Sequence, residues 1–239
     1  LVKWSLAMNS RCVPFRREKS PMFRLILSRF RRWHVKTLKP AVPVVSESLR
    51  VVLGDLNPDV ARAMSEAFAD LGSVEVVCGN LLDLTCDAIV SPANSFGNMG
   101  GGIDKAIDDF YEGQAQSAVM LAIREQFYGE LPVGVAMIVE MHTSRWPFVI
   151  VSPTMRMPGN IAGSINAYLS MRAVFVAILK HNRSNASKIK SVAIPGLGTG
   201  VGGLNYADAA SQMRAAYDNV IGGKWQNVVI AAQTPFAMR

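Results

Sequence analysis

The amino-acid sequence predicts an α/β fold, in which a mainly parallel β-sheet carries helices on both faces. From residue 49 onward, short apolar runs alternate with longer amphipathic helical patterns. Two glycine-rich loops each follow one of the apolar runs, and ligands of parallel α/β sheets collect at the carboxyl ends of the strands. With 239 residues, half of them hydrophobic, the chain can bury a full core, so one domain with an appendage is expected.

The expected strands are short apolar runs bounded by turn-forming residues. They lie at residues 49–54, 74–78, 88–90, 134–140, 147–151, 191–194 and 225–232. The expected helices are patterns that repeat apolar residues every three or four positions. They lie at residues 58–71, 103–110, 115–127, 165–179 and 206–221.

Residue types that favour helix ends set these helix boundaries. Asn57 is an N-cap that precedes a proline in the first helical position. Gly72 ends the first helix, and Gly113 separates the two helices that follow. Gly222 and Gly223 end the last helix, because glycine readily adopts the conformation that terminates a helix.

The net charge of +7 is unevenly distributed along the chain. Residues 1–43 contain eleven Lys or Arg residues and one acidic residue, which gives +10 there and −3 in the remainder. We therefore predict a basic N-terminal extension, residues 1–43, and a globular domain, residues 44–239. Residues 21–36 have the pattern of a basic amphipathic helix, for which three interpretations compete. It is a tail that attracts nucleic acid or a membrane surface, a targeting peptide that begins near Met22, or a segment without a role of its own.

Composition also bears on the compartment and on metal binding. The chain contains no run of 18 uncharged apolar residues, so no transmembrane helix is expected. Its three cysteines, Cys12, Cys78 and Cys86, lack the spacing of a metal site and indicate a reducing compartment. We expect a cytoplasmic monomer, with organelle targeting by the extension as the alternative location.

Residues 86–107 predict an anion-binding loop. The strand at 88–90 ends before Pro92, and the three glycines 100–102 precede Ile103 and Asp104, which begin a helix. A strand, a glycine loop and a helix start together present free backbone N–H groups and the positive end of a helix dipole. The alternative interpretation is an ordinary flexible connection between a strand and a helix.

A second glycine loop, residues 195–203, follows the strand at 191–194. It matches the pattern G-x-G-x-x-G, but only about 36 residues follow, too few for the further strand–helix units of a dinucleotide-binding half. No G-x-x-x-x-G-K-[ST] sequence occurs either. The two loops are therefore interpreted as facing walls of one phosphate-binding cleft.

Both loops resemble signatures of the macrodomain family. The segment GNLLDLTCDAIVSPANSFGNMGGGIDKAI at 79–107 is similar to that family's G-D-[IL]-…-DAIVNAAN-…-GGG-[VI]-D signature, and SVAIPGLGTGVGG at 191–203 is similar to its second phosphate loop. The order and the separation of the two signatures agree with the family. The resemblance extends over residues 49–232 and leaves residues 1–43 outside.

The resemblance implies a three-layer α/β/α domain with a mixed, mainly parallel sheet that binds ADP-ribose along one edge. By matching position, Asn94 would hydrogen-bond the distal ribose, and Asp104 stands where MacroD-type hydrolases carry an aspartate implicated in catalysis. Asp104 and Asn94 are therefore the expected catalytic residues. A carboxylate at this place can orient or deprotonate a water molecule aimed at the anomeric carbon. The other residues implied in ADP-ribose binding are Asn80 and Leu81 beside the adenine, Gly100, Gly101, Gly102 and Ile103 on one side of the diphosphate, and Gly198, Thr199, Gly200, Val201 and Gly202 on the other.

The sequence departs from the family pattern at three places. Asn80 stands where the family carries its adenine-recognising aspartate, and the usual N-A-A-N is replaced by S-P-A-N at residues 91–94. Asp108 stands where MacroD-type hydrolases carry a histidine, so two carboxylates lie four residues apart on one helix.

We expect an ADP-ribosyl hydrolase that removes mono-ADP-ribose from a modified acceptor or cleaves a 1″-substituted ADP-ribose, without a metal or cofactor. The alternative is a non-catalytic module that binds ADP-ribose, which Asn80 and Asp108 favour. In a third hypothesis, the basic extension makes the protein a nucleic-acid-associated factor. The expected partners are ADP-ribose or an ADP-ribosylated protein or nucleic acid. Asp55 is interpreted as a turn residue, and Arg156 as a charge partner for a phosphate.

Overall fold

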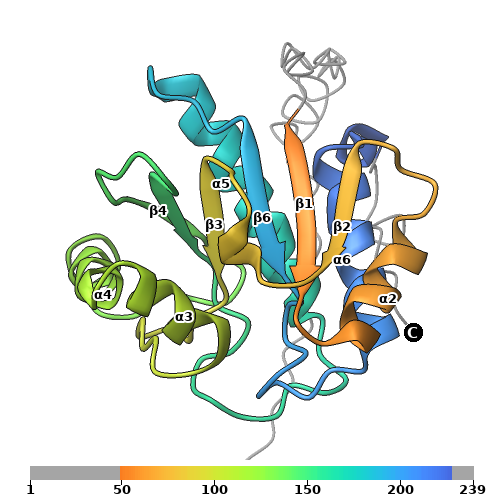
Figure 1. Cartoon of the computed structure of the whole chain (residues 1–239), viewed down its shortest axis with the longest axis horizontal. Coiled ribbons are helices and arrows are strands. Elements are labelled where there is room, and N and C mark those ends of the chain that lie inside the picture. Colours follow the sequence, from red (N-terminus) through yellow and green to blue (C-terminus); the bar gives the residue numbers. More distant parts are fainter. Residues whose placement is uncertain (1–48, 228–239) are drawn as a thin grey trace, which may run out of the picture. The chain divides into compact units, whose positions relative to one another are not determined.

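The domain is built on a six-stranded sheet with the strand order β2-β1-β6-β3-β5-β4 (Figure 1). A computed structural model describes residues 49–227, and the predicted extension, residues 1–43, lies outside the described residues. Neighbouring strands pair in parallel except for β4, which is antiparallel to β5. The strands are β1 (Arg50–Asp55), β2 (Val74–Cys78), β3 (Ala88–Ser91), β4 (Met137–Glu140), β5 (Phe148–Val151) and β6 (Ser191–Pro195).

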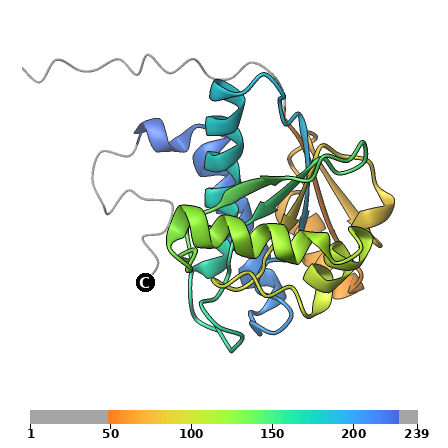
Figure 2. The ribbon, with the colours of Figure 1, turned by 90° about the vertical axis from the view of Figure 1, so that its left-hand side faces the viewer.

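Five α-helices of the described part of the chain cover both faces of this sheet. Side chains alternate along β1, so that Val51 and Leu53 pack with α2, α5 and α6 while Val52 packs with α3 and α4. Figure 2 shows α5 and α6 together on one side of the sheet. The predicted three-layer, mainly parallel fold is thus confirmed. The helices are α2 (Pro58–Ala67), α3 (Gly102–Phe110), α4 (Gln114–Phe127), α5 (Asn166–Ser184) and α6 (Tyr206–Val220).

Side-chain caps begin two of these helices. The side chain of Asn57 accepts a hydrogen bond from the N–H of Asp59 at 2.9 Å, as its predicted capping role requires. Asn205 caps α6 in the same way by accepting from Ala207 at 3.0 Å. None of the helices within residues 49–227 is long and apolar enough to span a bilayer.

The predicted closing strand at residues 225–232 is wrong over its first three residues. Lys224–Asn227 form a 3₁₀ helix, and residues 228–232 lie outside the described residues. Gly223 has a φ of 74° and turns the chain sharply after α6. Lys224 then contacts Asp218 of α6 at 2.7 Å, which holds the turn against the helix. Residues 225–227, Trp-Gln-Asn, also lack the β-branched side chains that begin at Val228.

Candidate functional site

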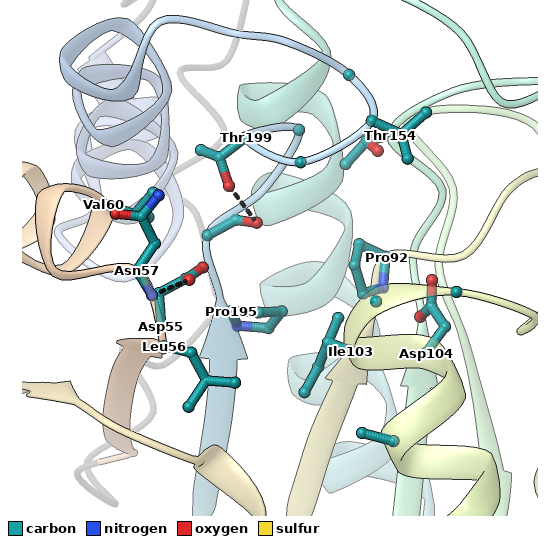
Figure 3. Close-up of a pocket in the computed structure, with 18 of the residues that line it drawn as sticks. Asp55, Leu56, Asn57, Val60, Pro92, Ile103, Asp104, Thr154, Pro195 and Thr199 are labelled. Atoms are coloured by element: carbon teal, nitrogen blue, oxygen red, sulfur yellow. Dashed lines mark hydrogen bonds between the residues drawn. The ribbon is translucent and has the colours of Figure 1, made fainter.

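The two glycine loops line one cavity of about 560 Å³ at the carboxyl ends of the parallel strands (Figure 3). A cavity of this size is typical of a small-molecule site. The residues that surround it follow the strand order, beginning with Gly79 and Asn80 after β2 and Asp55 at the end of β1. Gly196 and residues 198–202 follow β6, Pro92 and Asn94 follow β3, and Thr154 follows β5.

One wall of the cavity is the start of α3. Gly101 is the N-cap residue and has no side chain to satisfy the first turn, and Gly102 has a φ of 55°, which favours glycine. Within residues 49–227, the N–H groups of Gly101, Gly102 and Ile103 donate no hydrogen bond. Gly100 is different, because its N–H donates to the side chain of Asn98 at 2.9 Å and the residue does not line the cavity.

The opposite wall is the loop between β6 and α6. Gly198 has a φ of 73°, and a Cβ atom there would lie 2.7 Å from Leu204 Cδ1. The loop closes on itself through a hydrogen bond from the N–H of Leu204 to the carbonyl oxygen of Gly198 at 3.0 Å. In the described part of the chain, the N–H groups of four cavity-lining residues donate no hydrogen bond, namely Thr199, Gly200, Val201 and Gly202. N–H groups at a helix start and in a glycine loop point toward a common ligand, so both walls are suited to bind an anion.

Asp104 lines the cavity at the β3 end, across from Asp55 in Figure 3. Its Oδ1 accepts a hydrogen bond of 2.7 Å from the hydroxyl of Ser91, the fully buried last residue of β3. Loss of hydration raises the pKa of Asp104 to about 7, although the Ser91 hydroxyl partly opposes this increase. A carboxyl group with this pKa can exchange a proton near neutral pH.

Asn94 also lines the cavity, but its side chain organises the loop that follows β3. Its Oδ1 accepts hydrogen bonds from the N–H groups of Phe96 at 3.0 Å and Asn98 at 3.4 Å. Its Nδ2 donates to the carbonyl oxygen of Asn98 over 3.4 Å, which is long for a hydrogen bond. The Nδ2 of Asn94 thus makes only a weak hydrogen bond within residues 49–227. The predicted contact of Asn94 with a ribose stays a prediction.

Asn80 and Leu81 lie at the far end of the cavity, next to β2. The Oδ1 of Asn80 accepts from the N–H of Leu82, and its Nδ2 donates to Asp83, both at 3.1 Å. These bonds cap the short 3₁₀ helix Leu81–Asp83, and Leu81 itself is buried. Each polar atom of the Asn80 amide therefore makes one hydrogen bond within its own turn.

The sequence interpretation missed several cavity-lining residues. Asp55 and Leu56 enter the site because β1 ends at the same sheet edge as the glycine loops. This position after a parallel strand was the signal that could have identified them. Arg156 does not line the cavity, since its guanidinium pairs with Glu130 at 2.7 Å and lies over the ring of Phe96. Thr154, Met155 and Pro158 of the same loop do line it.

Asp108 does not line the cavity and has a different task. Its Oδ1 accepts a hydrogen bond of 2.8 Å from the N–H of Gln116 in the first turn of α4. We expect Asp108→Ala to lower the free energy of unfolding by about 1 kcal/mol, as loss of a helix cap does, and to leave the affinity of the cavity for its ligand unchanged. Urea denaturation and calorimetry measure the two quantities. A large loss of affinity without a loss of stability would contradict this assignment.

The described residues 49–227 contain no cluster of three or more His, Cys, Asp or Glu side chains placed to hold a metal ion. The predicted absence of a metal stays a prediction.

Comparisons with known proteins agree with this fold. The model of the Macro domain family matches residues 90–213, which is more than half of the chain. An uncharacterised protein of Aeropyrum pernix is 34% identical over 157 residues, which make up 65% of this chain and 75% of that protein. The macrodomain of Mycobacterium tuberculosis DarG superimposes with a TM-score of 0.50 and 25% identity, covering 59% of this chain and 87% of DarG's.

A third similar structure is that of Thermosipho africanus DarTG, which was solved in complex with ADP-ribose. It has a TM-score of 0.50 and 16% identity, and the match covers 69% of this chain and 49% of that one. At this identity the similarity concerns the fold alone. From the family match and the two glycine loops around one cavity, we conclude that the chain belongs to the Macro domain family.

Proposed function

We propose that the domain binds ADP-ribose in the cavity between the two glycine loops and hydrolyses the bond between the distal ribose and an acceptor. The observation that carries this proposal is a set of seven N–H groups around one cavity, three from the start of α3 and four from the loop after β6, that donate no hydrogen bond within residues 49–227. Two negatively charged phosphates between these walls would satisfy these donors. The ADP-ribose complex of the structurally similar DarTG protein supports the same choice of ligand.

The cavity offers a place for each part of the ligand. The diphosphate lies between the walls at Gly102 and Gly200, the nucleoside extends toward β1 and β2, and the distal ribose extends toward Asn94 and Asp104. The predicted binding residues of both walls line the cavity except Gly100. Gly100 instead shapes the loop through its bond to Asn98.

Asp104 is the proposed general base. Its carboxylate takes a proton from a water molecule while the water oxygen attacks the anomeric carbon of the distal ribose. The bond from that carbon to the acceptor breaks, and the acceptor departs with the bonding electrons and takes up a proton from solvent, while Asp104 returns the proton of the water to solvent. The products are ADP-ribose and the free acceptor. A pKa of about 7 favours this role, because a useful fraction of Asp104 is ionised at neutral pH while the carboxylate remains a competent base.

A non-catalytic ADP-ribose-binding module is the alternative function. It is favoured by the Asn94 side chain, whose oxygen is fully engaged within its own loop. The two functions separate when the full chain is incubated with a mono-ADP-ribosylated protein or nucleic acid. The hydrolase hypothesis predicts release of ADP-ribose that depends on Asp104. Tight binding of ADP-ribose with no release from either substrate would favour the binding module.

We expect the hydrolysis rate to rise with pH through a midpoint near 7, because Asp104 must be ionised to accept the proton. The Ser91 hydroxyl stabilises the ionised form, so Ser91→Ala raises the pKa of Asp104 further and moves this midpoint to higher pH. The pH dependence of kcat/KM for the wild type and the variant measures the shift. An unchanged midpoint, with a correctly folded variant, would contradict the role of this hydrogen bond.

The cytoplasmic location, the monomeric state and the contacts of the basic extension stay predictions. Residues 1–43, which carry the last of these, lie outside the described residues.

A further inference from the structure

Asp55 presents its carboxylate to the end of the cavity at which the proposed function places the nucleoside. It is the last residue of β1, it is half-buried, and it lines the cavity. Its Oδ1 accepts a hydrogen bond of 2.9 Å from the N–H of Asn57, which forms the turn into α2. Within residues 49–227, its Oδ2 accepts no hydrogen bond, although it lies close to Gly196, where a Cβ atom would come within 2.8 Å.

The position of Asp55 matches the nucleoside rather than the diphosphate. β1 lies between β2 and β6 in the sheet, so Asp55 lies between Asn80 on one side and the loop after β6 on the other. Figure 3 shows Asp55 on the opposite side of the pocket from Asp104. Two apolar side chains beside it, the exposed Leu56 and the buried Val60, supply surface for a flat ring.

A carboxylate at this place favours a ligand that carries a hydrogen-bond donor. An ionised carboxyl group accepts hydrogen bonds and donates none, and its negative charge disfavours a neighbouring diphosphate. A hydrogen bond from a ligand amino group offsets that repulsion. Asn80 is less suited to this contact, because its amide oxygen caps the 3₁₀ turn of residues 81–83 and its amide nitrogen is a donor, which cannot accept a hydrogen bond from an amino group.

We propose that Asp55 determines base specificity by accepting a hydrogen bond from the exocyclic amino group of the base, so that Asp55 takes over the function expected of residue 80. The proposal rests on the proposed binding of ADP-ribose. It predicts a preference for adenine over hypoxanthine, which carries a carbonyl oxygen in place of the amino group.

The test is calorimetry with ADP-ribose and with its hypoxanthine analogue, IDP-ribose. The wild type is expected to bind ADP-ribose about 10- to 100-fold more tightly, the range that a hydrogen bond to a charged group supplies. In Asp55→Asn, the amide oxygen can still accept the hydrogen bond from the N–H of Asn57. The amide N–H₂ group then faces the ligand and offers a donor in place of an acceptor. The variant should lose about 10- to 100-fold in affinity for ADP-ribose and keep or gain affinity for IDP-ribose.

Asp59→Asn is the matched control. It removes the same charge from the neighbouring turn, and Asp59 is exposed, paired with Arg62 at 2.8 Å, and does not line the cavity. Both affinities should stay at their wild-type values in this variant.

Three results would overturn the proposal. The first is that the wild type binds ADP-ribose and IDP-ribose equally well. The second is that Asp55→Asn weakens binding of both ligands equally, as loss of a ribose contact would. The third is that Asn80→Ala abolishes the preference for ADP-ribose while Asp55→Asn retains it. The wild-type ratio requires no variant and so does not depend on the folding of any substitution. Failure of the proposed function itself is distinguishable, because in that case the wild type binds neither ligand.

Discussion

Asp104→Asn is expected to slow the release of ADP-ribose by about 10²–10⁴-fold, the usual contribution of a general base. Affinity for ADP-ribose itself should change little, since the unpaired N–H groups of both loops remain in place. Single-turnover release and calorimetry measure the two effects. The matched control is Asp109→Asn on the same helix, because Asp109 is exposed, pairs with Lys105 at 2.6 Å and does not line the cavity. Full activity of Asp104→Asn would contradict the assignment of the base.

The same variant makes a prediction about stability that does not depend on catalysis. The folded-state pKa of Asp104 is raised to about 7, well above that of the unfolded chain, so the folded state holds this proton more tightly. Wild-type stability therefore falls as the pH rises from about 4 to 7, by at most about 4 kcal/mol at about 1.4 kcal/mol per pKa unit. The stability of Asp104→Asn does not fall in this way, because asparagine does not titrate. The difference in Tm between variant and wild type should accordingly be larger at pH 8 than at pH 5.

Gly202→Ala is expected to weaken ADP-ribose binding by about 10- to 100-fold. A Cβ atom at Gly202 would lie 2.6 Å from the carbonyl oxygen of Gly198 and 2.9 Å from Ile161 Cγ1. The first of these neighbours is backbone, so the loop must move and the N–H groups directed at the diphosphate must move with it. Each hydrogen bond to a charged group contributes about 1.5–3 kcal/mol, and loss of one or two gives the stated reduction.

Gly159→Ala is the control for this substitution. Gly159 lies in the neighbouring loop that contains Ile161, outside the cavity lining. Among the residues that the structure describes, a Cβ atom there would meet only Met157 O, at 3.8 Å. Calorimetry should give a wild-type affinity for Gly159→Ala. If Gly202→Ala also binds ADP-ribose normally, the loop after β6 does not hold the diphosphate.

Much of the fold follows from local patterns in the sequence. The cap at Asn57 and the alternation of apolar runs with helical patterns depend on short stretches of chain, and the structure contains these features. The two glycine loops follow parallel strands, so their position at one sheet edge could also be predicted. The 3₁₀ helix at residues 224–227 could not be predicted in this way, because it depends on the turn at Gly223 and on the pairing of Lys224 with Asp218.

The chemistry of single side chains was less predictable, because it depends on contacts between distant segments. The Ser91–Asp104 hydrogen bond joins a strand end to a helix start 13 residues later. Asp108 appears in the sequence as a second carboxylate near Asp104, yet its hydrogen bond to Gln116 gives it a capping role outside the cavity. The sequence identifies Asp55 as a turn residue, and its second carboxylate oxygen becomes significant only beside Gly196.

Calorimetric titration of the full chain with ADP-ribose, and with ADP, AMP and NAD for comparison, tests the central claim most directly. The arrangement of the cavity predicts that ADP-ribose binds more tightly than the other three, because it alone combines the base, the diphosphate and an unblocked distal ribose beside Asp104. Absence of ADP-ribose binding, or equal affinity for ADP-ribose and AMP, would contradict the assignment of this cavity.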